Sequence, residues 1–326
     1  MRPVDQRKLL SVVVPAYNED AVLDHFHRRM GALFDALPAY RCEMIFVNDG
    51  SHDGTQAAIE RLCRSDPRVA GVHLSRNFGK EIAITAGLDH ATGDAVAVID
   101  ADLQDPPELL VEMLRHWEGG YDMIYAKRRH REGESWLKKA TAHAFYRLMN
   151  KLSRVDMPPD TGDFRLMSRR AVDALLRMRE QHRFMKGLFA WVGFRSLAVE
   201  YDRGPRADGT SKFNYWQLWN LALEGITSFT IAPLKLATYL GLATAALAFS
   251  YGTWIIVKTL VYGESVRGYP TLMVTVLFLG GVQLFFTGVL GEYLGRVFDE
   301  SKRRPLYFAQ EVWSSGVSRD IAGPDR

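Results

Sequence analysis

The sequence predicts an α/β fold, a doubly wound parallel sheet with helices on both faces, followed by two long apolar helices. First, short β-branched segments alternate with segments of helical periodicity over the first 230 residues or so. Such alternation is typical of a parallel sheet covered on both sides. Second, polar sequences follow four of the expected strands, at the edge where ligands bind in such sheets. Third, the composition becomes strongly apolar after residue 233.

The elements of the sheet domain follow from local patterns. A run rich in β-branched residues predicts the first strand, and apolar residues three and four apart predict the first helix. Similar strand and helix patterns then alternate along the chain. We expect strands at residues 9–14, 43–47, 69–74, 95–99 and 122–126, and helices at residues 21–37, 56–63 and 80–90. The polar strand ends are residues 15–19, 48–51, 75–77 and 100–102.

Two apolar segments near the C-terminus predict a pair of transmembrane helices. Residues 233–262 carry only Lys235 and Lys258 as charged side chains, and residues 269–290 carry none. Each segment exceeds the roughly 20 residues needed to cross a bilayer. The alternative is a buried helical hairpin in a soluble protein, for which two such long segments are unusual.

Basic residues on either side of this pair predict its orientation. They are Arg203, Arg206, Lys212 and Lys235 before or at the start of the first segment, and Arg296, Lys302, Arg303 and Arg304 after the second. The loop between the segments offers little beyond Arg267, which Glu264 partly offsets. The positive-inside rule therefore places the sheet domain and both termini in the cytoplasm.

These patterns divide the chain into four parts. We expect a cytoplasmic sheet domain at residues 1–212, an interfacial amphipathic helix at residues 213–232, a transmembrane hairpin at residues 233–298 and a cytoplasmic C-terminal tail at residues 299–326. Trp216, Trp219 and Phe229 in the second part are typical of a membrane interface.

Composition and missing motifs exclude several classes of protein. The 41 basic and 38 acidic residues give a net charge of +3, too balanced for a general nucleic-acid binder. Cys42 and Cys63 form no C-x-x-C pair, which argues against a zinc site and fits a reducing compartment. No G-x-G-x-x-G follows the first strand and no P-loop motif occurs. Residues 1–8 lack the apolar run expected of a secretory signal peptide.

The stretch after the fourth expected strand has the chemistry of a metal site. Side chains two residues apart point the same way along an extended chain, so Asp100, Asp102 and Gln104 can converge their oxygens. Mg²⁺ and related hard cations prefer oxygen ligands, often one or two carboxylates together with substrate phosphates. The alternative for an isolated Asp-x-Asp is a solvated acidic turn. We expect Asp105 to cap a helix that begins at Pro106.

Several motifs occur together in an order known from one family. They are residues 14–19 (VPAYNE), 48–55 (NDGSHDGT), 76–80 (RNFGK), 100–107 (DADLQDPP), 161–166 (TGDFRL), 209–213 (GTSKF) and 304–307 (RPLY). With these motifs the chain resembles a membrane-anchored family 2 glycosyltransferase of the polyprenyl-phosphate branch. That branch includes dolichol-phosphate mannose synthases and bacterial undecaprenyl-phosphate glucosyltransferases. The two apolar segments resemble the bacterial type more closely, which implies the inner membrane.

The resemblance implies an activity and its partners. Such enzymes have a nucleotide-sugar domain of the GT-A type and transfer a sugar from a nucleotide diphosphate to a lipid phosphate, with inversion at the anomeric carbon. The expected reaction transfers glucose from UDP-glucose to undecaprenyl phosphate, with Mg²⁺ or Mn²⁺ as cofactor. GDP-mannose, a UDP-N-acetylhexosamine and a modified pentose remain alternative donors. Related enzymes suggest a homotetramer.

The resemblance also assigns residues to the donor and the metal. The metal ligands are Asp100, Asp102 and Gln104, and the catalytic residues are Asp163 and Asp102. Nucleotide-sugar binding falls to Pro15, Tyr17, Glu19, Asp49, Lys80, Asp100, Arg206 and Lys212. Asp49 has an alternative role as a turn residue before Gly50.

The role of Asp163 stays open. The family makes it a general base, yet a phosphate monoester loses its second proton near pKa 6. The lipid phosphate is therefore already a nucleophilic dianion at pH 7. Asp163 could instead orient the acceptor, hold a sugar hydroxyl or accept a proton from the minor monoanion.

The acceptor phosphate requires cations near the membrane. The residues assigned to it are Arg128, Lys139, Arg203 and Ser211. A basic stretch at residues 127–131 leads into residues 140–152, which have the pattern of an interfacial amphipathic helix. The alternative for this stretch is a solvated basic surface.

Three other functions compete with this interpretation. A polysaccharide synthase would need more spans and a Q-x-x-R-W motif, which residues 181–184 (QHRF) do not provide. A non-catalytic sugar-nucleotide sensor would be expected to lack the carboxylates, which are present. A glycosyltransferase that acts on soluble proteins would not need the apolar segments.

Overall fold

The computed structural model describes residues 6–129, 161–202, 230, 232–262, 268–314 and 317–320. The strands in these ranges form one sheet of nine, in the order β7-β5-β6-β4-β1-β2-β3-β8-β9. They are β1 (Lys8–Ala16), β2 (Tyr40–Asn48), β3 (Val69–Leu74), β4 (Ala95–Val98), β5 (Met123–Arg128), β6 (Thr161–Ser168), β7 (Ser196–Tyr201), β8 (Ala309–Ser314) and β9 (Val317–Asp320).

The centre of the sheet is parallel, as predicted. β1 pairs in parallel with β2 and β4, and β2 pairs in parallel with β3. The five predicted strands are confirmed, with bounds shifted by up to three residues. Parallel neighbours require a crossover connection, and helices supply it here. The four parallel strands β1 to β4 therefore end at the same edge of the sheet.

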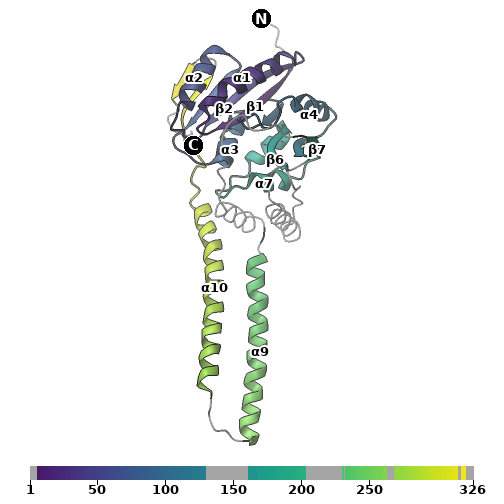
Figure 1. Ribbon diagram of the computed structural model, residues 1–326. Helices are drawn as coiled ribbons and strands as arrows, with labels where there is room; N and C mark the ends of the chain where they lie inside the picture. Colours follow the sequence, from purple (N-terminus) through teal and green to yellow (C-terminus); the bar gives the residue numbers. More distant parts are fainter. Residues whose placement is uncertain are drawn as a thin grey trace.

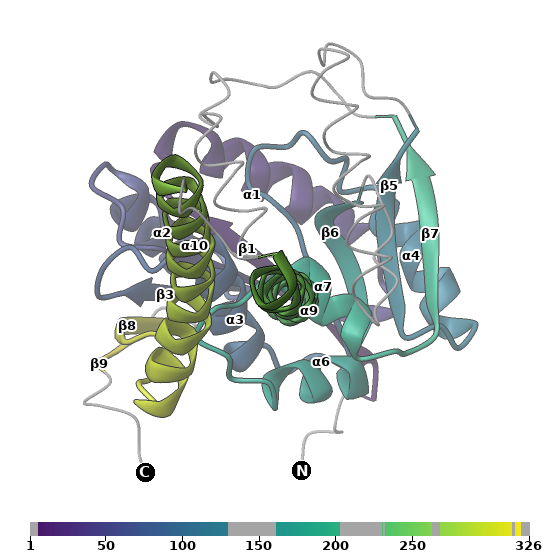
Figure 2. The same ribbon diagram turned by 90° about the horizontal axis from the view of Figure 1, so that it is seen from below.

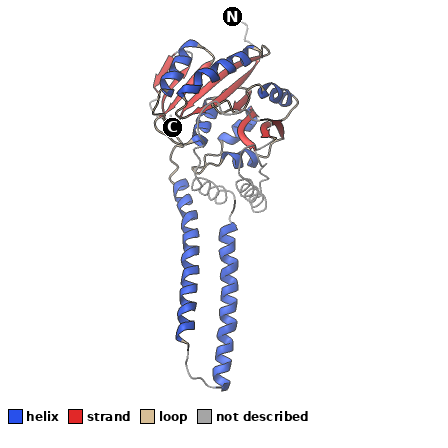
Figure 3. Ribbon diagram, viewed as in Figure 1, coloured by secondary structure: helices blue, strands red, loops and turns tan. Residues whose placement is uncertain are grey.

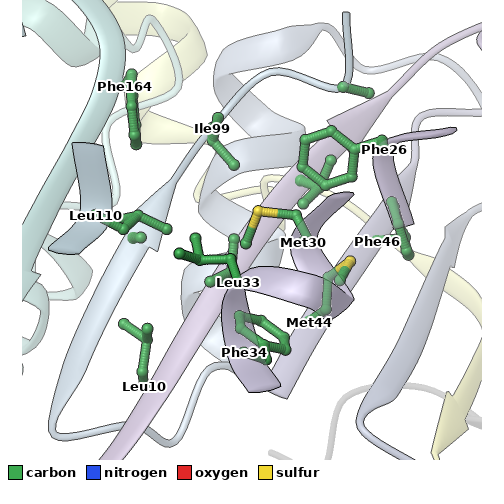
Figure 4. Close-up of a cluster of buried hydrophobic side chains, with 14 of the residues drawn as sticks. Leu10, Phe26, Met30, Leu33, Phe34, Met44, Phe46, Ile99, Leu110 and Phe164 are labelled. Carbon is green, nitrogen blue, oxygen red and sulfur yellow. The ribbon is translucent and has the colours of Figure 1, made fainter. Parts of the chain in front are cut away.

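Helices cover both faces of the sheet (Figure 3). In the sheet domain they are α1 (Asp20–Asp35), α2 (Thr55–Ser65), α3 (Lys80–His90), α4 (Leu109–Glu118), α6 (Arg169–Leu176) and α7 (Met185–Trp191). The buried residues of α1, α2 and α4 belong to one apolar core and those of α3, α6 and α7 to the other. Figure 4 shows part of the first core, in which Phe26 and Phe46 meet edge to face.

Strand periodicity explains why there are two cores. Val12 and Val14 of β1 point into the first core, and Val13 points into the second, because successive side chains alternate between faces. Helix α3 packs unusually close to β1. A Cβ on Gly87 would lie 2.2 Å from Val13 Cγ1, so this contact requires glycine.

The sheet also contains antiparallel strands that the sequence patterns did not predict. β6 pairs antiparallel with β4 and β5, and β8 pairs antiparallel with β3 and β9. The segment at residues 299–326 was expected to be a tail; the strands β8 and β9 within it extend the sheet. Apart from the β8–β9 pair, whose strands are close in sequence, these strands lie far along the chain from their partners. Local periodicity carries no information on such distant pairings.

Two long helices extend side by side away from the sheet domain (Figures 1 and 2). They are α9 (Ala232–Tyr262) and α10 (Tyr269–Ser301). Many of their apolar side chains are exposed, for example Phe249 and Leu247. Residues 233–254 of α9 are long and apolar enough to cross a membrane, and this is the one candidate span among the described residues.

The end of α10 is fastened to the sheet domain by polar contacts. The Gln181 backbone N–H donates to Glu300 at 3.0 Å, and His182 Nε2 lies 3.3 Å from Asp299 Oδ2. Further along, the Tyr307 hydroxyl donates to Asp89 at 3.0 Å. These contacts fix the point at which the chain returns from α10 to β8.

Candidate active site

Four loops gather at the carboxyl edge of the parallel strands. They follow β1, β2, β3 and β4 and contain the polar sequences at residues 15–19, 48–51, 75–77 and 100–102. Convergence at one edge follows from the parallel pairing, because every strand runs in the same direction. The prediction that these sequences share an edge is therefore confirmed.

Hydrogen bonds tie the first loop to the second. The Asn18 backbone N–H donates to Ser51 Oγ at 3.0 Å, and Asn18 Oδ1 accepts from the His52 N–H at 2.9 Å. The Glu19 backbone N–H donates to Thr55 Oγ1 at 2.9 Å. Tyr17, on the same loop, is 38% exposed. The predicted nucleotide residue Pro15 belongs to β1, and Tyr17 and Glu19 lie on the following loop, whose backbone these bonds fix.

Asp49 serves the neighbouring loop. Its carboxylate accepts from the backbone N–H groups of Phe78 at 2.7 Å and Gly79 at 2.9 Å. Burial raises the pKa of Asp49, although these two bonds oppose the shift. Gly50 has φ +63°, and a Cβ there would lie 2.3 Å from the Arg76 carbonyl carbon. Gly50 permits the tight turn, and Asp49 positions the neighbouring loop. Contact of Asp49 with the base of a nucleotide stays a prediction.

Lys80, Asp100 and Asp163 form a charged cluster next to these loops. The Lys80 Nζ lies 2.7 Å from Asp100 Oδ1, 2.8 Å from Asp100 Oδ2 and 2.6 Å from Asp163 Oδ2. The sheet register explains the meeting of the two carboxylates. Val98 of β4 is paired with Arg165 of antiparallel β6, so residue 100 continues toward residue 163.

The cluster holds Asp163 as an anion. Burial favours the neutral acid, but the charges of Lys80 and then Lys186 outweigh it and lower the pKa of Asp163. Burial also opposes the charge on Lys80, yet Asp100 and Asp163 raise the pKa of Lys80. For Asp100 burial prevails and the pKa is raised, with Lys80 opposing. A carboxylate with a lowered pKa binds protons weakly, so Asp163 is a fixed negative charge and a poor base.

Three unsatisfied oxygens mark the place where a ligand fits. Among the described residues, the buried side-chain oxygens without a hydrogen bond are Asp100 Oδ1, Gln104 Oε1 and Asp163 Oδ1. Asp100 Oδ1 has only its ion pair with Lys80. Buried acceptors normally have partners, so these oxygens are suited to a cation or to substrate hydroxyls.

The turn at residues 102–104 places the predicted metal ligands. Asp102 Oδ1 accepts from the Gln104 backbone N–H at 3.1 Å, and Leu103 between them has φ +56°, which is unusual for a non-glycine residue. No group of three His, Cys, Asp or Glu side chains in the described ranges surrounds a common point for a metal. Two carboxylates and an amide oxygen are ligands of the type that a divalent cation prefers, and substrate phosphates commonly complete such a shell.

Arg165 is a site residue that sequence reasoning did not single out. Its guanidinium donates to the carbonyls of Gly162 at 3.0 Å and Asp163 at 3.3 Å. It lies 3.4 Å from the ring centre of Phe189, and burial lowers the pKa of Arg165 to about 10. Arg165 therefore fixes the backbone that carries Asp163. A basic residue between the apolar residues Phe164 and Leu166 was the available signal.

Glu81 was also missed. It follows Lys80 at the start of α3 and accepts from the Met185 backbone N–H at 3.3 Å. Burial and then Asp163 raise the pKa of Glu81 to about 7, against the opposing charges of Lys80 and Lys186. The first turn of a helix commonly carries an acidic residue, so Glu81 had an ordinary structural explanation in the sequence.

Arg128 belongs to a second buried polar group. Its Nε donates to the Tyr201 hydroxyl at 3.2 Å, and that hydroxyl donates to Asp105 through a short hydrogen bond. Arg128 Nη2 lies 4.0 Å from Asp105 Oδ1. A Cβ on Gly162 would lie 3.7 Å from both Arg128 Nη2 and Asp105 Oδ2. The group therefore lies beside the residue that precedes Asp163.

This arrangement corrects the expectation for Asp105. Helix α4 begins at Leu109, and its N-cap residue Glu108 makes no side-chain capping bond. The carbonyls of Pro106 and Pro107 accept the first helical N–H groups at 3.2 and 3.0 Å. Because the two prolines form their own turn, Asp105 is left to pair with Tyr201.

Several predicted site residues lie outside the described part of the chain. They are Lys139, Arg203, Arg206, Ser211 and Lys212, together with the expected amphipathic segments at residues 140–152 and 213–229.

Comparisons with known proteins cover almost the whole chain. The family profile for Glycosyl transferase family 2 matches residues 11–176, and the profile for the GtrB C-terminal hairpin matches residues 232–297. The prophage bactoprenol glucosyl transferase homolog of Escherichia coli K12 is 49% identical over 303 residues, covering 93% of this chain and 99% of that protein.

Two further proteins extend the comparison. The bactoprenol glucosyl transferase of Shigella phage SfV is 51% identical over 298 residues, covering 91% of this chain and 97% of that protein. Among solved structures, glucosyl-3-phosphoglycerate synthase from Mycobacterium tuberculosis, in complex with Mn²⁺, UDP-glucose and phosphoglyceric acid, aligns with 68% of this chain and 78% of that chain. The identity is 21% and the TM-score 0.45.

Proposed function

Because the chain belongs to glycosyl transferase family 2, we propose that it transfers glucose from UDP-glucose to a polyprenyl phosphate with inversion of the anomeric carbon. Relatives about half identical over most of the chain are named bactoprenol glucosyl transferases. The match of the C-terminal hairpin profile to residues 232–297 supports the same group of enzymes. The product is a polyprenyl-phosphate sugar, which serves later glycosylation of the cell envelope.

One observation of the structure supports this proposal most strongly. Asp100, Gln104 and Asp163 have unsatisfied buried oxygens, and Asp100 and Asp163 both pair with Lys80 beside the carboxyl edge of four parallel strands. A site of this kind provides charged groups of both signs for a nucleotide diphosphate. A purely structural ion cluster would be expected to satisfy its own oxygens.

We assign the metal to Asp100, Asp102 and Gln104. Mg²⁺ or Mn²⁺ held there supplies Lewis-acid stabilisation of the charge that develops on the departing diphosphate. The nucleotide is assigned to the loop of Pro15, Tyr17 and Glu19 and to Asp49, with Arg206 and Lys212 contributing from outside the described ranges.

In the reaction an oxygen of the acceptor phosphate attacks the anomeric carbon as the bond to the diphosphate oxygen breaks. The electron pair of that bond leaves with UDP. The acceptor is already a dianion at pH 7, so no strong base is required. This agrees with the lowered pKa of Asp163. We therefore propose that Asp163 orients the reactants and balances the charge of Lys80.

The acceptor phosphate is assigned to Arg128, together with Lys139, Arg203 and Ser211. Arg128 Nε is engaged by Tyr201, and Nη2 lies 4.0 Å from Asp105 Oδ1. These contacts hold the guanidinium beside the residue that precedes Asp163, where its charge can bind a phosphate. We further propose that α9 and α10 both cross the inner membrane, that the sheet domain is cytoplasmic, and that the enzyme is a homotetramer. The apolar exposed surface of the two helices supports the membrane assignment.

The proposal is tested with membranes that contain the protein, undecaprenyl phosphate, Mg²⁺ or Mn²⁺ and a panel of radiolabelled sugar nucleotides. We expect label from UDP-glucose in the lipid fraction. Label from GDP-mannose, a UDP-N-acetylhexosamine or a UDP-pentose instead would keep the reaction and change the donor. A lipid fraction without label from any donor would contradict the proposed function.

A further inference from the structure

The Lys80 ammonium stands where a cation belongs. It lies within 2.8 Å of both oxygens of Asp100 and 2.6 Å from Asp163 Oδ2. The first of these carboxylates is the proposed metal ligand and the second is the proposed catalytic residue. One ammonium group therefore pairs with two carboxylates of the site at once.

We propose that Lys80 is an internal counter-ion that competes with the divalent cation for Asp100 and moves to the donor's diphosphate when donor and cation bind. This inference rests on the proposed function. It gives Lys80 two successive partners, Asp100 in the empty site and the nucleotide in the loaded site. Family resemblance assigned it only the second.

Electrostatics require this competition. A divalent cation on Asp100 and an ammonium within 2.8 Å of the same oxygens would repel each other strongly, because the pair is screened less near a protein surface than in bulk water. Asp100 Oδ1 has no hydrogen bond to hold it otherwise. Occupation of Asp100 by one cation therefore favours departure of the other.

Lys80 is able to move without disturbing the fold. Its side chain is 45% exposed, whereas that of Asp163 is 14% exposed. Its four-carbon stem is flexible and its charge is a point charge without a required orientation. The backbone just before it stays fixed, because the Gly79 N–H donates to buried Asp49 at 2.9 Å. Displacement is thus confined to the side chain.

The competition predicts opposite effects of one substitution on two ligands. Without the ammonium, Asp100 has no rival cation, so the metal alone binds more tightly. Without the ammonium, the diphosphate loses a charge-assisted contact, so the nucleotide binds more weakly. A residue with only a structural role would weaken both.

The test measures the affinity of the full-length protein in lipid nanodiscs, first for Mn²⁺ alone and then for UDP. Electron paramagnetic resonance titration of Mn²⁺ should show roughly tenfold tighter binding for Lys80→Met than for the natural protein. Lys80→Arg retains the charge and should stay within about threefold. Lys8→Met is the matched control, because Lys8 lies over Trp117 at the opposite end of β1 and its loss should leave Mn²⁺ binding unchanged.

Calorimetric titration with UDP at saturating Mn²⁺ measures the effect of the substitution on nucleotide affinity. Lys80→Met should bind UDP roughly tenfold more weakly. Equal or weaker Mn²⁺ binding by Lys80→Met, with this variant folded as judged by circular dichroism, overturns the inference. If the natural protein still forms lipid-linked glucose in that case, the proposed function stands. If Lys80→Met binds Mn²⁺ more tightly but the natural protein forms no lipid-linked glucose, the competition is supported and the proposed function is contradicted.

Discussion

The sheet domain buries most of its large apolar side chains, whereas the α9–α10 hairpin exposes many of its own. Phe26 and Phe46 of the domain are fully buried, whereas Phe249 of α9 is 78% exposed. Burial of apolar area supplies most of the stability of a domain in water. The domain meets that need with its own two cores, and the hairpin needs an apolar surrounding. In our proposal the chemistry is located in the self-sufficient region, and the hairpin brings that region to a lipid acceptor.

The largest expected effect separates the two regions by stability. Phe26→Ala should lower the free energy of unfolding of the sheet domain by about 3–5 kcal/mol, because it leaves a cavity in a packed core. Phe249→Ala, at an exposed position of α9, should change it by no more than about 0.5 kcal/mol. Denaturant titration of both variants in lipid nanodiscs measures the difference. Equal losses would show that α9 packs against protein.

The next effect concerns catalysis in the domain. Asp163→Asn should lower turnover roughly 10²- to 10³-fold, because a neutral amide cannot balance Lys80 or orient charged reactants. Steady-state kinetics should show UDP binding within about threefold of the natural protein. Asp173→Asn is the matched control, since this exposed residue pairs only with Arg169 one turn away. Near-normal turnover of Asp163→Asn would remove Asp163 from the chemistry.

A smaller effect tests the link between domain and lipid. Asp105→Asn weakens the group that positions Arg128, so the KM for polyprenyl phosphate should rise about tenfold while the KM for UDP-glucose stays unchanged. Asp202→Asn, a surface partner of Arg129 at 3.6 Å, should change neither constant. An equal rise in both KM values would contradict the assignment of Arg128 to the acceptor.

The smallest effect is a difference between the two regions in how folding stability depends on pH. Burial opposes the charge on Asp66, but hydrogen bonds from Arg68 and His27 lower the pKa of Asp66 to about 2. A folded-state pKa below the unfolded value adds stability above pH 4 that is lost as the pH falls toward 2. Melting curves should therefore lose less stability in acid for Asp66→Asn than for the natural protein. The helical signal of α9, which has no acidic residue, should persist.

Much of the fold could be predicted because local sequence patterns determine its central strands and helices. Residues 9–14 and 95–99 read as strands from their apolar runs, and the alternation with helices implied parallel pairing and a shared ligand edge. The pairing of the antiparallel strands β6 and β8 with β4 and β3 could not be predicted, because pairing between distant segments leaves no periodic trace. The β6 register is what brings Asp163 to Asp100.

The candidate site was predicted by residue type and only in part by geometry. Carboxylates after a strand pointed to Asp100 and Asp102, and family resemblance pointed to Asp163 and Lys80. The roles of Arg165 and of Tyr201 with Asp105 depend on contacts across the sheet. Short-range rules suggested a helix cap for Asp105, and tertiary contacts prevailed over that preference.

The most direct test of the proposed reaction is the anomeric configuration of the product. Purified protein in nanodiscs is incubated with UDP-glucose, undecaprenyl phosphate and Mn²⁺, and the extracted lipid is examined by NMR spectroscopy. UDP-glucose carries an α-linked sugar, so inversion predicts a β-glucosyl phosphate attached to the polyprenyl chain. An α-linked product, or no lipid-linked glucose at all, would contradict the account.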